Sequence, residues 1–299
     1  MRWQCPPGLV ARGSGEATGP TVANFVAVLP LRDENPTRHS PFVTWLILAA
    51  CLVAFFVWQP TPFSTTDDDL EFNLRHAAIP CEVVEGRPLS VDEVVATFRI
   101  GDDSACGVGS ASPPFDAGKD VWLAVVVSMF LHGGVLHLAG NMWFLWVFGN
   151  NVEDRLGKVG FALFYLAGGV AATAAHIAVD GSSTVLVVGA SGAIAAVMGA
   201  YMVWFPNVPV RTAVIMFFIT VVDVPAKWVL GFWFVLQFFT DPNQGVAWMA
   251  HVGGFAFGVV VALAVQAIIG PPRVTPPGGR TAGGWPPSGP DDRRFGGGY

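Results

Sequence analysis

Hydrophobic residues gather in long runs along the chain, separated by short polar connections. A helix of about 20 apolar residues crosses the roughly 30 Å of hydrocarbon in a bilayer. One shorter apolar piece, 208–222, is interrupted by Pro209 and Arg211, so we expect a re-entrant or interfacial segment there, with a seventh span as the alternative. The other runs predict six spans, at about 42–59, 121–148, 159–179, 187–205, 224–240 and 246–269.

The composition also favours a membrane protein. Hydrophobic residues make up 53% of the 299 residues and charged residues only 13%, against about 25% charged in a typical soluble domain. The mean hydropathy is +0.52. The net charge of −6 says little about partners because the acidic residues concentrate in one loop, and no stretch favours nucleic-acid binding. The expected fold class is therefore all-α, a polytopic bundle of six transmembrane helices.

The polar segments predict the domains and their orientation. We expect a mostly flexible N-terminal arm at 1–40, a membrane domain at 41–269 and a disordered Pro/Gly-rich tail at 270–299. Basic residues mark the cytoplasmic side. They occur in the arm, in the tail and after the second and fourth spans, while "VDGSST" and "TDPNQG" have none. Both termini are thus expected in the cytoplasm and the loop 60–120 outside. The first run has no cleavage site and is read as a retained helix.

The four cysteines show no metal-binding spacing. Cys81 and Cys106 share the loop 60–120, and an oxidising compartment would allow them to form a disulfide. The sequence leaves both the free and the bonded state open.

Polar side chains within spans are the candidates for chemistry, because a central charge costs roughly 2.5–3.5 kcal/mol on insertion scales. His137 and Asn141 lie four residues apart and share one helix face, as either a catalytic pair or a polar clamp between helices. His132 is expected to be structural or interfacial, and His176 to make a structural hydrogen bond. The complete set is His132, His137, Asn141, His176, Ser191 and His251.

Ser191 and His251 each open a helix rich in small residues, and such helices can pack closely. Ser191 on its own would be read as packing. With a neutral histidine beside it as base, its hydroxyl becomes a nucleophile for acyl transfer, and backbone N–H groups at a helix N-terminus can stabilise the oxyanion. No acidic residue lies in a span near His251, so the sequence predicts a dyad.

At these residues the sequence resembles the rhomboid family of intramembrane serine proteases, over about 41–269. "HGGVLHLAGN" resembles the family's second-span motif, and "LPLRDENPTRHSP" resembles the start of many bacterial relatives, so a bacterial type in a bacterial cell membrane is expected. Three more motifs follow in the family's order: GxxxExxxG at Gly149, Glu153 and Gly157, GxSG at Gly189, Ser191 and Gly192, and AHxxGxxxG at Ala250, His251, Gly254 and Gly258.

The resemblance implies a rhomboid-like six-helix core with a Ser191–His251 dyad and an oxyanion site made by His137, Asn141 and the Ser191 N–H. It implies an endopeptidase that cleaves transmembrane proteins within or near their spans and needs no metal or organic cofactor. The substrates would enter laterally from the lipid, and the site would open to the outer side. Glu153 is expected to be structural, with a solvated loop acid as the alternative.

The sequence departs from the family's pattern at two places. Leu123 and Ala124 stand where a Trp-Arg pair is common. Ala195 replaces an aromatic that often packs beneath the catalytic histidine, so Trp248 or Phe255 is expected to support His251. The stretch "GFWFVLQFF", 231–239, fits either a loosely held gate or a lipid-facing surface.

Two other functions stay open. A catalytically silent rhomboid-like protein would bind transmembrane helices, although such relatives usually lose the serine or the histidine. A small transporter would use the polar residues as a path, although the chain shows no inverted repeat.

Overall fold

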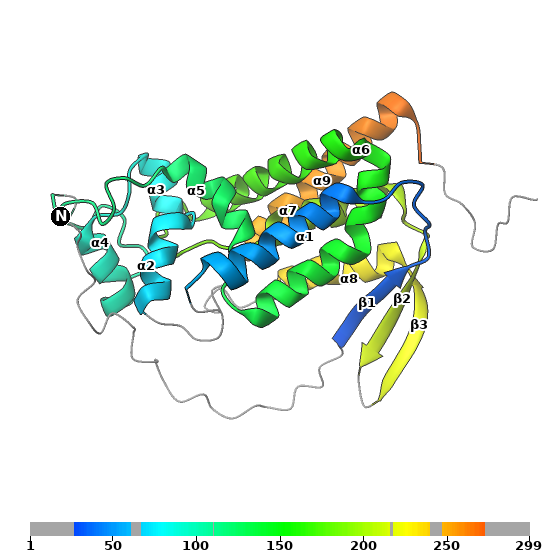
Figure 1. Cartoon of the computed structure of the whole chain (residues 1–299), viewed down its shortest axis with the longest axis horizontal. Coiled ribbons are helices and arrows are strands. Elements are labelled where there is room, and N and C mark those ends of the chain that lie inside the picture. The colour runs from blue at the N-terminus through cyan, green and yellow to red at the C-terminus, as the bar shows by residue number, and fades with distance from the viewer. Residues whose placement is uncertain (1–26, 61–66, 110, 216–217, 240–246, 273–299) are drawn as a thin grey trace, which may run out of the picture.

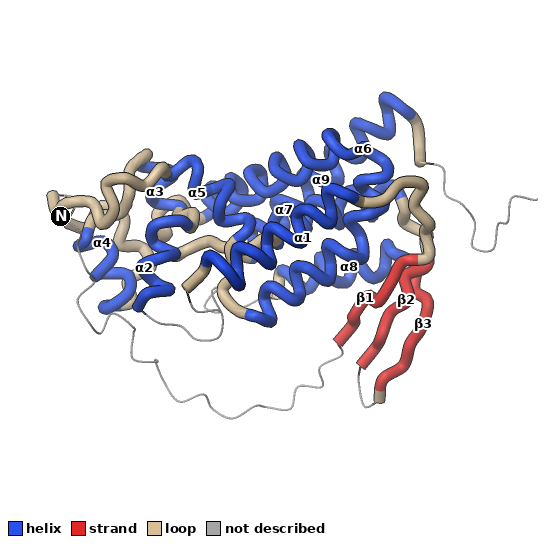
Figure 2. Tube along the Cα trace, in the orientation of Figure 1, coloured by secondary structure: helices blue, strands red, loops and turns tan. Residues whose placement is uncertain are grey.

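A computed structural model describes residues 27–60, 67–109, 111–215, 218–239 and 247–272. Figure 1 shows a bundle of helices with three strands at one end and short helices at the other. Figure 2 shows the same division by element type. Residues 1–26 of the arm expected at 1–40, and residues 273–299 of the expected tail, lie outside the described residues.

The bundle is built around one buried helix, α7, whose residues from Gly192 to Tyr201 are all buried. Its neighbours α6 and α9 are the two described helices that are long and apolar enough to cross a membrane. Helix α1 continues into a π-helical turn at Ala54–Trp58. The helices of the bundle are α1 (Phe42–Val53), α6 (Val135–Val179), α7 (Ser191–Trp204), α8 (Ala226–Gln237) and α9 (Trp248–Ile269).

Helix α6 consists of two limbs that meet at Gly157, whose φ of 71° and ψ of 165° are not helical. A positive φ of this kind favours glycine. Figure 1 shows the chain turning back at this end of the bundle. Both ends of α6 consequently lie near the N-terminus of α7, since His137 lies beside Gly189 and Ala172 beside Gly192.

The single span predicted at 121–148 is wrong at its start. Asp120 caps a separate short helix, α5 (Val121–Val127), by accepting hydrogen bonds from the backbone N–H groups of Trp122 and Leu123. A 3₁₀ turn follows at Ser128–Phe130. Gly133 and Gly134 then interrupt the helix, because glycine is a poor helix former, and α6 begins at Val135. His132 therefore precedes the helix in which it was predicted.

The expectation of an all-α fold is corrected by a three-stranded antiparallel sheet with the order β1-β2-β3. Strand β1 (Ala27–Asp33) comes from the arm that was expected to be mostly flexible. Strands β2 (Pro209–Ile215) and β3 (Ile219–Pro225) replace the re-entrant or interfacial segment predicted at 208–222. β-branched residues favour strands, and "VRTAVI" and "ITVVDV" are rich in them.

The opposite end of the bundle carries the segment between α1 and α5. It forms α2 (Asp67–His76), α3 (Pro80–Glu85), α4 (Val91–Val95) and a π-helical turn at Ala96–Ile100. Cys81 and Cys106 form a disulfide, which decides between the free and bonded states that the sequence leaves open.

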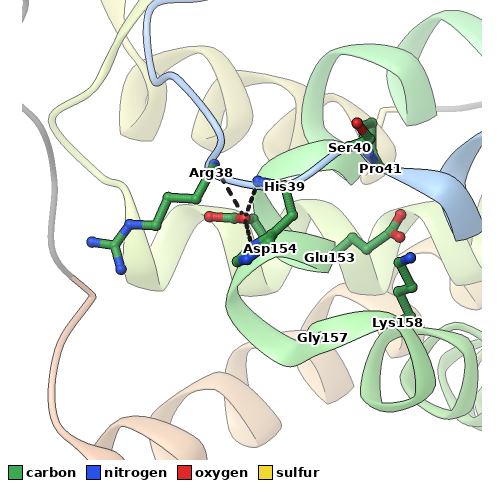
Figure 3. Close-up of a pocket in the computed structure, with 8 residues that line it drawn as sticks. All are labelled: Arg38, His39, Ser40, Pro41, Glu153, Asp154, Gly157 and Lys158. Atoms are coloured by element: carbon green, nitrogen blue, oxygen red, sulfur yellow. Dashed lines mark hydrogen bonds and ion pairs between the residues drawn. The ribbon is translucent and has the colours of Figure 1, made fainter.

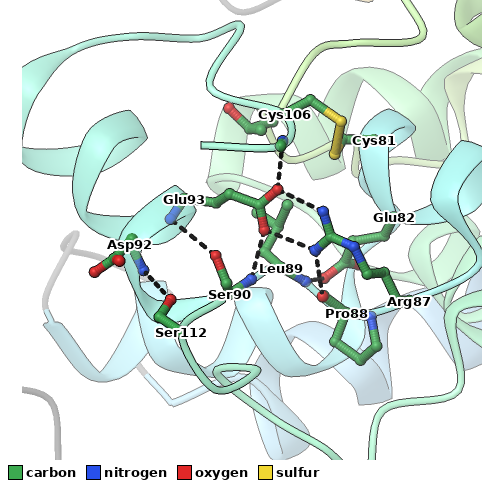
Figure 4. A network of polar contacts seen from close by, with 12 residues as sticks. Cys81, Glu82, Arg87, Pro88, Leu89, Ser90, Asp92, Glu93, Cys106 and Ser112 are labelled. Atoms are coloured by element: carbon green, nitrogen blue, oxygen red, sulfur yellow. Dashed lines mark hydrogen bonds and ion pairs between the residues drawn. A yellow bond between two sulfur atoms is a disulfide. The ribbon is translucent and has the colours of Figure 1, made fainter. Parts of the chain in front are cut away.

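A buried carboxylate lies beside this disulfide (Figure 4). Glu93 accepts two hydrogen bonds of 2.8 Å from the Arg87 guanidinium, one of 2.6 Å from the Ser90 N–H and one of 2.7 Å from the Gly107 N–H. Burial acts to raise the pKa of Glu93, but these hydrogen bonds outweigh burial and lower the pKa to about 2. The charged carboxylate therefore stabilises the fold of this segment.

Helices α7 and α9 approach until their backbones touch. A Cβ added at Gly254 would overlap the carbonyl oxygen of Gly192, and one added at Gly258 would overlap that of Ala196. A Cβ at Gly192 would in turn lie 2.6 Å from the Ala172 Cβ of α6. Only small residues allow three helices to meet in this way.

The substitution Gly258→Ala should destabilise the protein by about 1–3 kcal/mol, because the added methyl group must displace a backbone carbonyl. Thermal unfolding in detergent would measure the loss. Gly231→Ala in α8 is the matched control, since nothing lies within 4 Å of its added Cβ, and it should leave stability unchanged or slightly raised. Equal melting temperatures for the two variants would contradict the close packing.

Acid should remove the contribution of Glu93. Its folded pKa of about 2 lies below the ordinary value of 4.5, so the stabilisation is complete above about pH 4.5 and is lost as the pH falls toward 2. Glu93→Gln should therefore be less stable than wild type at pH 6, by about 3 kcal/mol, and the difference should shrink as the pH falls to 2. A difference that does not depend on pH would contradict this role for the charge.

Candidate active site

Ser191 is the first residue of α7, and the two residues before it set its position. Gly189 has a φ of 123°, in the region that favours glycine. Its N–H donates to the Ser128 carbonyl over 2.9 Å, which ties the turn to the segment before α6. The chain therefore enters α7 with the serine at the positive end of the helix.

His251 lies in the first turn of α9 and faces Ser191, although 60 residues separate them in sequence. Its Nε2 lies 2.8 Å from the Ser191 Oγ, within hydrogen-bond distance. The same close approach of α7 and α9 that requires Gly254 brings these two side chains together.

His137 and Asn141 project from the first turns of α6 toward the same place. A Cβ at Gly189 would lie 2.8 Å from the His137 Nε2 and 3.7 Å from the Ser191 Oγ. The Asn141 side-chain amide donates to the His137 carbonyl over 2.9 Å. Of the other two candidate histidines, His132 is buried with its ring 5.3 Å from that of His137, and His176 is partly buried in α6.

All four predicted site residues, Ser191, His251, His137 and Asn141, line one cavity of about 1270 Å³. Polar residues of the short-helix end also line it, among them Asn73 of α2. The cavity is large enough for water and for a short stretch of extended peptide.

The second nitrogen of His251 has a partner that the sequence analysis missed. Gln237, the last residue of α8, places its Oε1 2.7 Å from the His251 Nδ1. The Gln237 Nε2 donates to the Trp233 carbonyl over 2.9 Å. A glutamine within "GFWFVLQFF" was the available signal, because an uncharged polar side chain in an apolar helix usually hydrogen-bonds to another helix.

The aromatic support of His251 also comes from α8. The Trp233 ring lies 5.9 Å from the His251 ring, centroid to centroid. Phe255 contributes indirectly, stacking on Trp233 at 6.3 Å. The expectation that Trp248 or Phe255 supports His251 is thus corrected, because the ring that contacts His251 among the described aromatic residues is that of Trp233.

Figure 3 shows Glu153 and Asp154 at the sheet end, with Asp154 accepting hydrogen bonds from the segment before α1. Glu153 itself caps the N-terminus of α1. Its carboxylate accepts hydrogen bonds from the N–H groups of Val43 at 2.9 Å and Thr44 at 2.7 Å, and from the Thr44 hydroxyl at 2.8 Å. A Cβ at Gly149 would lie 3.1 Å from the Thr44 side chain, so a glycine there allows α1 to approach α6. Glu153 is buried, and its neighbour Asp154 binds the segment before α1.

Among the described residues, one group has the atoms for a metal site: Cys81, Glu93 and Cys106. The two sulfurs are bonded to each other, so neither is a thiolate ligand. Both Glu93 oxygens are hydrogen-bonded. This group does not fit a metal ion.

The fold is mostly helical, and a serine and a histidine are paired at the N-termini of two touching helices. These features define a class of helical proteins with a candidate Ser–His site. Residues 119–267 match the rhomboid domain family, and the chain therefore belongs to the rhomboid family, whose members are embedded in membranes.

Three curated relatives have organellar names. The chain is 34% identical over 93 residues to presenilin-associated rhomboid-like protein A, mitochondrial, of Danio rerio, covering 30% of this chain and 24% of the relative. It is 33% identical over 85 residues to RHOMBOID-like protein 6, mitochondrial, of Arabidopsis thaliana, covering 28% and 27%. It is 40% identical over 73 residues to rhomboid-like protein 11, chloroplastic, of the same plant, covering 24% and 26%.

The matched part spans about a quarter of the length of each relative. The expectation of a bacterial type in a bacterial cell membrane is not borne out, because these relatives are mitochondrial and chloroplastic proteins.

Glu153→Gln should destabilise the protein by about 1–3 kcal/mol, because an amide leaves at least one of the three donors of α1 without an acceptor. Thermal unfolding in detergent would report the loss. Glu85→Gln, at an exposed acid of α3, is the control and should have the melting temperature of wild type. If the Glu153 variant also has the melting temperature of wild type, the cap does not stabilise α1.

Proposed function

We propose that this protein is an intramembrane serine endopeptidase that uses a Ser191–His251 dyad. The observation that carries the proposal is the 2.8 Å contact between the Ser191 Oγ and the His251 Nε2. This contact lies at a cavity that could hold a peptide segment. A pair that served packing alone would not need the cavity or the neighbouring donors.

In the first half of the reaction, the His251 Nε2 removes the proton from the Ser191 hydroxyl while Oγ bonds to the carbonyl carbon of the peptide. The tetrahedral intermediate collapses when the C–N bond breaks. His251 gives its proton to the leaving amine, and an ester to Ser191 remains. A water molecule, deprotonated by His251, then hydrolyses the ester and restores the serine.

The oxyanion of each intermediate needs donors that are already in place. The Ser191 N–H at the start of α7 is one candidate. The His137 ring lies beside Gly189, and the Asn141 amide would supply a further donor by turning from the His137 carbonyl toward the cavity. We assign these three groups to the oxyanion site.

The membrane domain in this proposal has six spans: α1, the two limbs of α6, α7, α8 and α9. Each limb of α6 has 22 residues, about 33 Å of helix, which is enough to cross the hydrocarbon. Large apolar side chains point outward on several of these helices, as lipid contact requires: Leu46, Leu163, Val260 and Ile268 are all more than half exposed.

The sheet end is proposed to face the cytoplasm. Arg32, Arg155, Lys158 and Arg211 lie there, at β1, β2 and the bend of α6, which agrees with the preference of basic residues for that side. Both termini of the membrane domain would then be cytoplasmic, and Ser191 would open toward the outer side. The substrates would be transmembrane proteins that enter laterally beside α8.

Cleavage of a single-span model substrate by the purified protein in detergent tests the proposal. Ser191→Ala and His251→Ala should each reduce cleavage by at least about 10³-fold, because the two groups act as a unit. Ser104→Ala and His39→Ala, at exposed positions, should cleave like wild type. Wild-type cleavage by either dyad variant would overturn the dyad. Substrate binding without any cleavage by wild type would instead identify a helix-binding protein.

A further inference from the structure

We propose that Gln237 is a positioning residue that fixes the tautomer and the direction of the His251 ring. This inference rests on the proposed function and extends the dyad to a neutral third member from α8. The residues involved come from three helices: Ser191 from α7, Gln237 from α8 and His251 from α9.

The orientation of the Gln237 amide follows from its two neighbours. The Trp233 carbonyl can only accept a hydrogen bond, so the amide atom 2.9 Å from it must be the NH₂ group. The other amide atom, 2.7 Å from the His251 Nδ1, is then the carbonyl oxygen. An oxygen of this kind cannot donate.

The tautomer of His251 follows from the amide. A carbonyl oxygen beside Nδ1 is satisfied only when Nδ1 carries the ring proton. In the neutral ring Nε2 then has the free electron pair, and Nε2 is the nitrogen 2.8 Å from the Ser191 Oγ. Gln237 thus selects the form of the histidine that can act as the base. The opposite tautomer would point a proton at the serine and leave the Gln237 oxygen without a donor.

The same contact acts after proton transfer. The imidazolium donates from both nitrogens, and the Gln237 oxygen still accepts from Nδ1, so the ring keeps its direction while Nε2 returns the proton to the leaving group. Trp233, one helical turn before Gln237, lies against the same ring. Both side chains come from α8, so this helix fixes the orientation of the base.

The surroundings of His251 leave few other groups for this role. The titratable side chains close enough to interact electrostatically with His251 are His137 and His176, both of α6. In the part of the chain that the structure describes, the ring nitrogens of His251 contact Ser191 and Gln237, and neither is an acid. Gln237 is itself buried, so its amide would be costly to place there without partners.

The test is the pH dependence of cleavage by the full chain in detergent, for wild type, Gln237→Leu, Gln237→Met and Gln237→Glu. In the two apolar variants kcat should fall about 10- to 100-fold, while KM stays within about twofold of wild type. The loss is smaller than the full rate contribution of a general base, about 10²–10⁴-fold, because His251 is still present. Gln237→Glu should retain activity. The acid limb of its pH–rate profile should move to higher pH, because a carboxylate beside Nδ1 favours the imidazolium. Gln266→Leu, near the other end of α9, is the matched control and should behave as wild type.

The outcomes separate this inference from the proposed function. If wild type cleaves the substrate and both folded apolar variants have the kcat of wild type, the role of Gln237 is overturned. The proposed dyad is not affected by that result. An acid limb in Gln237→Glu identical to that of wild type leads to the same two conclusions. Wild type that neither cleaves nor reacts with a fluorophosphonate probe overturns the proposed function and this role together. Melting temperatures equal to wild type ensure that the apolar variants report on the site.

Discussion

The contact between the backbones of α7 and α9 determines how Ser191 and His251 lie relative to each other. Gly254 and Gly258 lie against the carbonyl oxygens of Gly192 and Ala196, with no room for a side chain. Because the helices touch there, the first turn of α9 brings His251 to 2.8 Å from the serine that begins α7. A wider spacing would leave Ser191 as one more small polar residue in an apolar helix. Close packing and the proposed chemistry therefore depend on the same few atoms.

The two ends of the bundle hold this centre in different ways. At the sheet end, Glu153 replaces the missing hydrogen-bond partners of the first turn of α1 and joins it to α6. At the other end, a disulfide and the buried Glu93 network join α3, α4 and the loop after them, and α2 lines the cavity. Val187 pairs with Ala78 there, so the approach to Ser191 is tied to that segment. The mouth of the site is thus built by residues outside the matched rhomboid domain as well as within it.

Much of the fold and site could be predicted from local patterns. The long apolar runs marked the helices, and the spacing of Gly254 and Gly258 after His251 indicated a helix face made for close approach. The failures have physical causes. The strand at Ala27–Asp33 is stable only because it pairs with β2, about 180 residues later, and no local pattern contains that pairing. The interruption after Phe130 depends on two glycines inside an apolar run. Gln237 was missed because its partner, the far nitrogen of His251, is defined only once α8 is placed against α9.

The central claim is that His251 activates Ser191 across the contact of α7 and α9. Mass spectrometry of the purified protein after reaction with a fluorophosphonate probe tests this most directly, because the adduct reports which oxygen is nucleophilic. The account predicts a single adduct on Ser191 in wild type and in Ser104→Ala, and its loss in His251→Ala although the serine is still present. An adduct on a different residue, or labelling of Ser191 at the same rate without His251, would contradict it.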